Sequence, residues 1–177
     1  YFDKENMILT FLWDRSPWLD RSKLSKQKHI QYTARDGLEI RGYLTLPVNS
    51  NGKNLPMIVH PHGGPNTRDT YGYDPYVQFL ASRGYAVFQP NFRGSTGYGA
   101  YHYISANKQF GKTMQDDITD GVYYLINNGV ADKDRIAIFG GSYGGYATMA
   151  GLTFTPDLYA AGINYVGVVD LELLQED

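Results

Sequence analysis

One serine in the sequence has the neighbours that nucleophilic catalysis requires. Residues 135–147 contain Gly140-x-Ser142-x-Gly144 directly after an apolar, strand-like run and before a run of small residues typical of a helix. This is the context of a nucleophile elbow, a strained strand-to-helix turn from which a serine hydroxyl projects. Glycine is needed two positions to either side because a Cβ there would collide with neighbouring backbone. Ser142 is therefore the candidate nucleophile, and Gly140 and Gly144 are the candidate elbow glycines.

The same stretch has simpler interpretations. A glycine-rich turn between a strand and a helix can bind a phosphate group at the helix N-terminus, or can merely turn the chain. The stretch has neither a following Gly-Lys-Ser/Thr nor the spacing Gly-x-Gly-x-x-Gly. The pattern therefore favours the nucleophile elbow over a nucleotide-binding loop.

A serine nucleophile needs a general base, and its tetrahedral intermediate needs hydrogen-bond donors for the oxyanion. One donor is the backbone N–H of Tyr143, the residue after the nucleophile, where helix amides point outward. The second is expected in the loop after the first buried parallel strand, which reads His60-Pro61-His62-Gly63-Gly64-Pro65. Glycine allows the backbone to approach a substrate, and we choose the amide of Gly64 over that of Gly63.

Other polar residues have ordinary structural interpretations. His60 and His62 share a strand face, but two histidines without a third ligand make a poor zinc site, so both are expected to shape the loop. Asp116 and Asp120 share a helix face near its start, where acidic side chains complement the helix dipole and are usually solvated. No metal site and no cofactor is predicted.

Aromatic residues cluster around the glycine-rich loop at positions 93–99. They either line a substrate cleft or pack on the surface, and the sequence leaves both interpretations open. The residues concerned are Phe92, Tyr98, Tyr101 and Tyr103.

The elements that would position these residues predict an α/β fold. Short apolar runs at 57–60, 85–89, 135–139 and 161–169 alternate with helical periodicity, which indicates a mostly parallel sheet. Val77, Leu80 and Ala81 fit one helical stripe. A second stripe, whose helix should end at Asn127-Asn128-Gly129, comprises Ile118, Val122, Leu125 and Ile126. Residues 28–34 and 38–46, separated by Arg35-Asp36-Gly37, predict an N-terminal hairpin of antiparallel edge strands.

Composition limits the possible functions. The composition, 42% hydrophobic and 19% charged, is typical of a globular chain. A length of 177 residues is too short for two full domains. Cysteine is absent, so thiol nucleophiles and thiolate zinc sites are excluded. The net charge of −2 predicts no nucleic-acid partner. The sequence has neither a long apolar run nor a signal-peptide pattern, so we expect no membrane association and a cytoplasmic location.

The N-terminal stretch is expected to be separate from the catalytic unit. Residues 1–27 contain an apolar run, Met7 to Trp13, and a stretch of cations that begins at Arg21 and continues to Lys28, just beyond them. They are interpreted as the remnant of a preceding domain and a linker, with a basic docking patch as the alternative. Residues 28–177 are interpreted as an incomplete catalytic domain. Because the chain starts at Tyr1 without a methionine, it is expected to be part of a longer polypeptide or a processed form.

Together these motifs resemble the prolyl oligopeptidase family of α/β-hydrolase serine peptidases, most closely its acylaminoacyl-peptidase and dipeptidyl-aminopeptidase-like branch. The resemblance covers about residues 17–170. It depends on several motifs in order: Pro17-Trp18-Leu19-Asp20, residues 32–37, His62-Gly63-Gly64-Pro65, residues 91–99, Asp116-Asp117 and residues 140–145.

The resemblance implies an α/β-hydrolase fold, truncated after about the sixth strand. Ser142 would form an acyl-enzyme with short or N-acylated peptides, and the amides of Gly64 and Tyr143 would bind the oxyanion. It also implies a missing N-terminal β-propeller and a missing C-terminal part of the catalytic domain. Oligomer formation is compatible with the sequence.

The chain departs from the family pattern in its histidines. The triad order in this fold is serine, acid, histidine, yet all four histidines precede Ser142 (His29, His60, His62 and His102). Asp170 follows the strand after the elbow, whereas the family places its acid after a further strand, so Asp170 is not assigned to a triad. The isolated chain is expected to be inactive. A carboxylesterase is an alternative, disfavoured by Pro65 and by the Arg93–Gly97 loop, and a non-catalytic fragment or pseudoenzyme is another.

Overall fold

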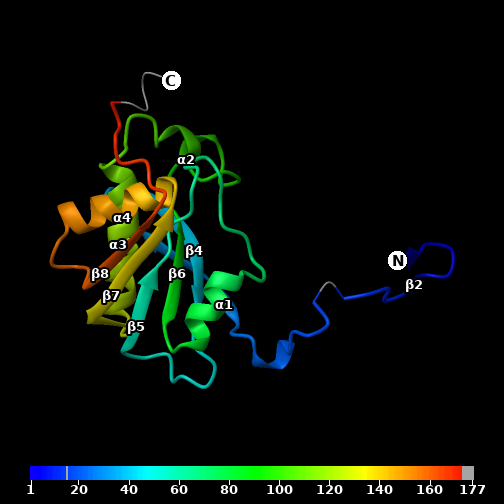
Figure 1. The fold of residues 1–177 in the computed structure, drawn as a ribbon. Coiled ribbons are helices and arrows are strands. Elements are labelled where there is room, and N and C mark those ends of the chain that lie inside the picture. Colours follow the sequence, from blue (N-terminus) through cyan, green and yellow to red (C-terminus); the bar gives the residue numbers. More distant parts are fainter. Residues whose placement is uncertain (15, 173–177) are drawn as a thin grey trace.

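The computed structural model describes residues 1–14 and 16–172, so the last five residues of the expected catalytic domain lie outside the described residues. A six-stranded mixed sheet forms the centre of the molecule, in the order β3-β4-β6-β5-β7-β8 (Figure 1). Its strands are β3 (Gln27–Thr33), β4 (Glu39–Thr45), β5 (Leu55–Val59), β6 (Ala86–Asn91), β7 (Ala131–Gly141) and β8 (Ala161–Tyr165).

Strands β6, β5, β7 and β8 are parallel neighbours, as the apolar runs predict. Strands β3 and β4 form the predicted antiparallel hairpin, in which Gly37 adopts a φ of 91° that suits glycine. The expectation that both are edge strands is wrong for β4. It also pairs with β6 in antiparallel orientation, so of the two hairpin strands it is β3 that lies at an edge of the sheet.

Helices cover both faces of the sheet. Helix α1 (Pro75–Ser82) lies on one face, and α3 (Thr113–Asn127) and α4 (Tyr143–Phe154) lie on the other (Figure 1). Helix α3 ends where predicted, and Gly129 follows it with a φ of 70°. The short helices η1 (Arg21–Lys23) and α2 (Ala100–Ile104) were not predicted, because so few residues carry no measurable periodicity.

The main core lies between the sheet and α3. Met57 of β5, Phe88 of β6 and Ile138 of β7 are fully buried against the apolar stripe of that helix. The stripe includes Ile118 and Val122, which are also fully buried. Burial of this apolar surface fixes the strands, and thereby the loops at their carboxyl ends.

The first residues extend away from the sheet (Figure 1). Strands β1 (Phe2–Asp3) and β2 (Ile8–Leu9) form a separate two-stranded sheet, so only two residues of the apolar run at 7–13 are strand. Its large side chains are exposed; Leu9 retains 79% and Trp13 71% of its accessible surface.

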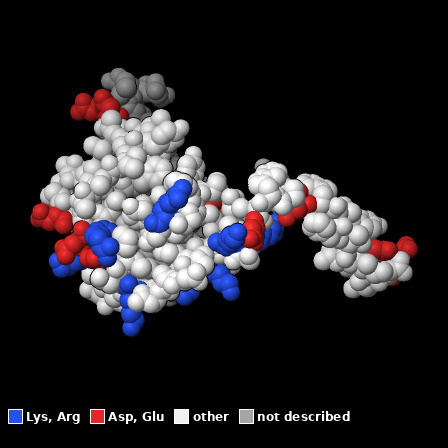
Figure 2. Space-filling model, turned by 60° about the horizontal axis from the view of Figure 1, so that its bottom comes forward, with Lys and Arg blue, Asp and Glu red and all other residues white. Residues whose placement is uncertain are grey.

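Charges of both signs are interspersed on the face seen in Figure 2, and much of that face carries neither sign. Within residues 1–14 and 16–172, no helix has the length and hydropathy needed to cross a bilayer.

Candidate active site

Ser142 lies at the sharp junction between β7 and α4. Its φ of 55° and ψ of −122° are a conformation that L-residues rarely adopt, and its side chain is exposed. The backbone N–H of Ser142 donates to the carbonyl oxygen of Tyr165, at 3.0 Å, which ties the turn to the end of β8. The predicted strand–turn–helix context is therefore present, with an accessible hydroxyl at its apex.

The two elbow glycines have the predicted steric role. A Cβ added to Gly140 would overlap the carbonyl oxygen of Gly144, and a Cβ added to Gly144 would overlap that of Pro61. Both neighbours are backbone atoms, which cannot move aside as a flexible side chain can. Any side chain at either position would therefore force the start of α4 away from β7 or from the β5 loop.

The glycine loop after β5 lies against the nucleophile. A Cβ built on Gly63 would lie 3.9 Å from Oγ of Ser142 and 3.3 Å from the carbonyl oxygen of Gly141. The following residue, Gly64, has a φ of 112°, which an L-residue could adopt only with strain. The loop thus brings backbone close to the serine.

Tyr143 can offer only its backbone to the site. It is the first residue of α4, where an amide has no acceptor within the helix. Its ring is buried against Phe92 and Phe110, with ring centroids 5.3 and 4.8 Å away, and burial raises the pKa of its hydroxyl. The side chain therefore anchors the helix start.

His62 and His60 make structural contacts, as their loop positions predict. Nδ1 of His62 lies 2.6 Å from the carbonyl oxygen of Gly63, and its Nε2 lies 2.9 Å from Oγ of Ser95. Burial lowers the pKa of His62 to about 4. Nδ1 of His60 lies 2.7 Å from the carbonyl oxygen of Phe139.

No histidine of the described residues hydrogen-bonds Ser142. His29 stacks on Tyr71, and Nε2 of the buried His102 lies 3.1 Å from the carbonyl oxygen of Phe92. The same residues contain no group of three or more His, Cys, Asp or Glu side chains that could hold a metal ion.

A pocket of about 450 Å³ adjoins the serine's neighbours Gly63 and Gly141. Asp69 lines it. Burial, with the negative charge of Asp74 nearby, raises the pKa of Asp69 to about 7. Its backbone is fixed by Asn91, whose Oδ1 accepts from the Asp69 N–H at 2.8 Å.

The shifted pKa values of His62 and Asp69 predict opposing effects of pH on the free energy of unfolding. In the folded protein between about pH 4 and pH 6.5, His62 is neutral and Asp69 is protonated. On unfolding in this range, His62 takes up a proton and Asp69 releases one. The first effect raises the free energy of unfolding as pH rises, and the second lowers it, so the two largely offset.

Asp69→Asn should reveal the contribution of His62 to the pH dependence of stability, because it removes the opposing contribution of Asp69. The free energy of unfolding of this variant is expected to rise by up to about 3 kcal/mol between pH 4 and pH 6.5, more steeply than that of the wild type. At pH 8 the variant should be more stable than the wild type, which then buries an ionised carboxylate. Urea unfolding at several pH values measures this, with the exposed Asp157→Asn as control. Equal slopes for Asp69→Asn and the wild type would contradict the assignment.

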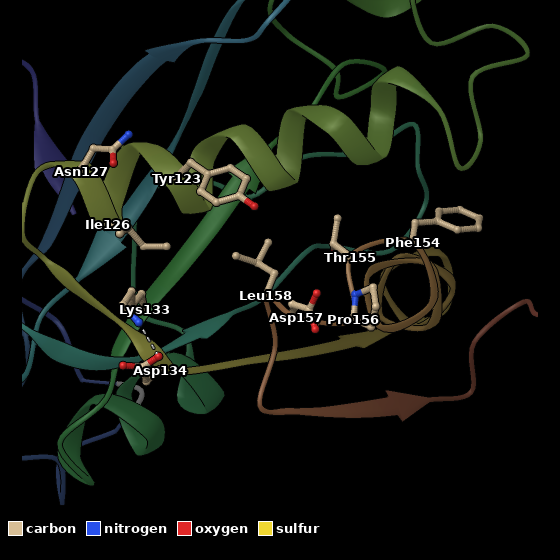
Figure 3. A pocket seen from close by; sticks show the side chains of 10 residues that line it. All are labelled: Tyr123, Ile126, Asn127, Lys133, Asp134, Phe154, Thr155, Pro156, Asp157 and Leu158. Atoms are coloured by element: carbon tan, nitrogen blue, oxygen red, sulfur yellow. Dashed lines mark hydrogen bonds and ion pairs between the residues drawn. The ribbon is translucent and has the colours of Figure 1, made fainter.

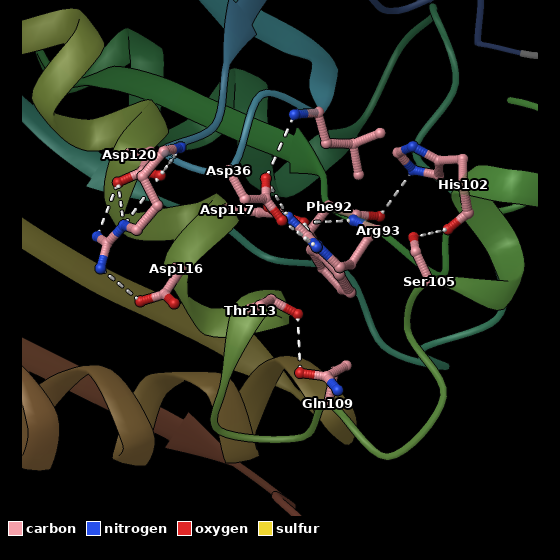
Figure 4. Close-up of polar contacts among 12 residues, drawn as sticks. Asp36, Phe92, Arg93, His102, Ser105, Gln109, Thr113, Asp116, Asp117 and Asp120 are labelled. Carbon is pink, nitrogen blue, oxygen red and sulfur yellow. Dashed lines mark hydrogen bonds and ion pairs between the residues drawn. The ribbon is translucent and has the colours of Figure 1, made fainter.

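An ion-pair network next to the site was missed from the sequence (Figure 4). Arg93 donates from Nη2 and Nε to the two carboxylate oxygens of Asp117, at 2.7 and 2.8 Å, and from Nη1 to Asp36, at 2.7 Å. The backbone N–H of Arg93 also donates to Asp117, which is fully buried. The network holds the loop at 93–99 against α3 and the hairpin turn.

Asp116 and Asp120 are not simply solvated as expected. Both pair with Arg35, at 2.8 and 2.7 Å, and the Asp120 side chain retains only 13% of its accessible surface (Figure 4). Their shared helix face therefore binds the hairpin turn.

The aromatic residues around this loop have different environments. Phe92 is fully buried, which fits neither a cleft nor a surface position. Tyr101 and Tyr103 are exposed, and the hydroxyl of Tyr98 accepts from Nδ2 of Asn91 at 2.8 Å.

Another pocket, of about 500 Å³, lies at the other end of β7 (Figure 3). It includes Lys133 and Asp134, which form an exposed ion pair at 2.8 Å. These residues are near the start of β7, whereas Ser142 follows its end, about 25 Å away by strand rise. This pocket is therefore separate from the serine.

Comparisons with known proteins agree on one family. Residues 71–177 match the model of the prolyl oligopeptidase family. Dipeptidyl aminopeptidase BIII of Pseudoxanthomonas mexicana is 43% identical over 98% of this chain and 26% of its own length. The acylamino-acid-releasing enzyme of Sus scrofa is 33% identical over 77% of this chain and 18% of its own length.

Solved structures give the same result. A puromycin-hydrolysing peptidase of Mycobacterium tuberculosis has a TM-score of 0.85 and 32% identity, over 90% of this chain and 25% of its own. Pyrococcus horikoshii acylaminoacyl peptidase has a TM-score of 0.78 and 33% identity, over 88% of this chain and 26% of its own. The chain thus spans about a quarter, or less, of the length of these relatives.

Proposed function

Because the chain belongs to the prolyl oligopeptidase family and has the α/β-hydrolase fold, we propose that it supplies the nucleophile and the oxyanion donors of a serine peptidase. The observation that carries this proposal is the exposed Ser142 at a positive-φ turn, next to the glycine loop after β5. Such a turn is energetically unfavourable for serine, and it is typical of a nucleophile elbow.

In the proposed reaction, Oγ of Ser142 attacks the carbonyl carbon of the scissile bond. The backbone amides of Tyr143 and Gly64 donate to the oxygen that becomes negatively charged. The leaving amine departs with a proton, and water then hydrolyses the acyl-enzyme and releases Ser142.

The proton transfers need a general base and a general acid. In this fold, a histidine that follows the nucleophile in the sequence performs both roles. All four histidines precede Ser142 in the sequence. We assign the triad histidine and its acidic partner to chain beyond residue 177, so the 177 residues alone should have negligible turnover. Loss of a triad member leaves only about 10³- to 10⁴-fold acceleration over water.

The proposed substrates are short peptides, with either a free or an acylated N-terminus. Relatives named for dipeptide release and for acylamino-acid release both match the chain. These matches support both kinds of peptide substrate and do not favour one over the other. A preceding β-propeller, which residues 1–27 would join to the catalytic domain, would restrict the site to short chains.

Hydrolysis by the full-length protein tests the proposal. Dipeptidyl anilides, N-acetyl-aminoacyl anilides and short-chain p-nitrophenyl esters should be compared at equal concentrations of titrated serine. Substantial cleavage of at least one anilide class is expected. Cleavage of esters alone would instead indicate a carboxylesterase. No cleavage, together with no labelling of Ser142 by a fluorophosphonate, would indicate a non-catalytic protein.

A further inference from the structure

We propose that Asn51 is a site of spontaneous deamidation and that the fold protects Asn128, although a glycine follows each of them. The pair Asn51-Gly52 lies in the loop between β4 and β5, and Asn128-Gly129 follows α3. The reactants are the chain itself and water. This inference does not depend on the proposed peptidase activity, because it concerns the opposite end of the sheet from Ser142.

The reaction has two steps and needs no oxidant or reductant. The peptide nitrogen of the glycine loses its hydrogen to a base in solution and attacks Cγ of the asparagine, whose amide nitrogen leaves as ammonia with a proton from water. Water then hydrolyses one of the two C–N bonds of the resulting cyclic imide, which gives aspartate or isoaspartate. One water is consumed and one ammonia is released. The reaction therefore requires an available peptide N–H and a side chain that can bend onto it.

The peptide nitrogen of Gly52 meets the first requirement. Within residues 1–14 and 16–172, its N–H donates to no hydrogen-bond acceptor. Gly52 has no Cβ that would hinder attack on the preceding side chain. Asn51 is exposed, so base and water reach both groups. The attacking nitrogen is therefore available in the folded protein.

The side chain of Asn51 is already folded back over that nitrogen. Its Oδ1 accepts from the backbone N–H of Lys53 at 3.0 Å. The ring that this hydrogen bond closes contains both Cγ of Asn51 and the nitrogen of Gly52. The hydrogen bond also draws electron density from the side-chain carbonyl group, which makes Cγ a better electrophile. Holding two reacting groups near each other lowers the entropic part of the barrier.

Both reacting groups of the second pair are bound elsewhere. Nδ2 of Asn128 donates to the carbonyl oxygen of Tyr124 at 2.7 Å, which turns the side chain back along α3. The N–H of Gly129 donates to the carbonyl oxygen of Ile126 at 2.8 Å. Attack on Cγ of Asn128 therefore requires that both hydrogen bonds break first.

The two pairs otherwise have similar surroundings. They precede β5 and β7, which are parallel neighbours, so both lie at the amino ends of these strands. The N–H of Asn54 donates to the carbonyl oxygen of Gly129 at 2.9 Å, which joins the two loops. Asn51 and Asn128 are both exposed. Access to water therefore does not distinguish the two sites, whereas their hydrogen bonds do.

Peptide mapping of the full-length protein provides the measurement. The protein is incubated at pH 8, both folded and in guanidinium chloride, until the unfolded sample has reacted at both sites. The tryptic peptides 42–53 and 113–133 contain one Asn-Gly pair each. Mass spectrometry gives the share of each peptide in which an amide has become a carboxyl group, after subtraction of an unincubated sample. Fragmentation then locates the change within the peptide.

In the folded protein, Asn51 should react roughly 10- to 100-fold faster than Asn128, because two hydrogen bonds of ordinary strength must break at the second site. In guanidinium chloride the two rates should be nearly equal, since the same dipeptide reacts at both. Asn51→Gln should abolish the change at position 51, because glutamine would have to form a larger ring. Asn128→Gln is the matched control and should leave the rate at Asn51 unchanged.

Three results would overturn the inference. The first is equal rates at Asn51 and Asn128 in the folded protein, and the second is a reaction at Asn51 that occurs only in guanidinium chloride. The third is a preference for Asn51 that persists after unfolding, because the neighbouring sequence and not the fold would then cause it. All three comparisons use the wild type, so they remain decisive even where a variant does not fold.

Discussion

Ser142→Ala in the full-length protein is expected to lower kcat by roughly 10⁴- to 10⁶-fold, because no acyl-enzyme can form without the hydroxyl. KM should change little, since the substitution removes one oxygen atom and leaves the surrounding site in place. Anilide hydrolysis measures kcat, and mass spectrometry of the fluorophosphonate-treated protein locates the label. The wild type should carry one label, on the peptide that contains Ser142.

Ser82→Ala is a suitable control, because Ser82 is exposed at the end of α1 and its hydroxyl donates to the carbonyl oxygen of the nearby Phe79. It should retain full activity and full labelling. A Ser142→Ala protein that still hydrolyses anilides at more than a hundredth of the wild-type rate would show that another group performs the chemistry.

Asp117→Asn is expected to lower the free energy of unfolding by about 3 kcal/mol. The carboxylate is fully buried and accepts three hydrogen bonds from Arg93. The amide is nearly the same size, but it removes the negative charge and directs an N–H₂ group at a guanidinium. Arg93 would then keep only Asp36, whose side chain is 41% exposed. Urea unfolding at pH 7 provides the measurement.

The neighbouring residue on α3 gives a control with the same chemistry. Asp116 is 37% exposed and makes one ion pair, with Arg35. Asp116→Asn should therefore cost less than about 1 kcal/mol. If both variants lost the same amount of stability, the buried network would not be a major contribution to the fold.

The elbow could be predicted from the sequence because its causes are local. Gly140, Ser142 and Gly144 lie within five consecutive positions, and the steric requirement for glycine is set by backbone atoms within one turn and one adjoining loop. The parallel strands and the end of α3 were likewise encoded in runs of a few residues. In contrast, nothing in residues 39–45 indicates that β4 pairs with β6 rather than lying exposed beside β3.

Contacts between distant residues could not be predicted in this way. The pair Arg93–Asp117 joins residues 24 positions apart, and His62 meets Ser95 across 33 positions. Hydrogen-bond partners at such separations leave no periodic pattern in a single sequence. The sequence therefore predicted that His62 shapes the loop, but only the structure identifies the atoms that it holds.

In the role proposed for Ser142, its backbone conformation sets stability and turnover against each other at one position. A non-glycine residue with such dihedral angles costs roughly 1 to 3 kcal/mol of stability. Glycine would remove that penalty, and it would also remove the hydroxyl that the proposed reaction requires. Laboratory evolution of this protein for thermal endurance alone would thus favour losing the serine, and screens for robust variants need a catalytic readout in every round.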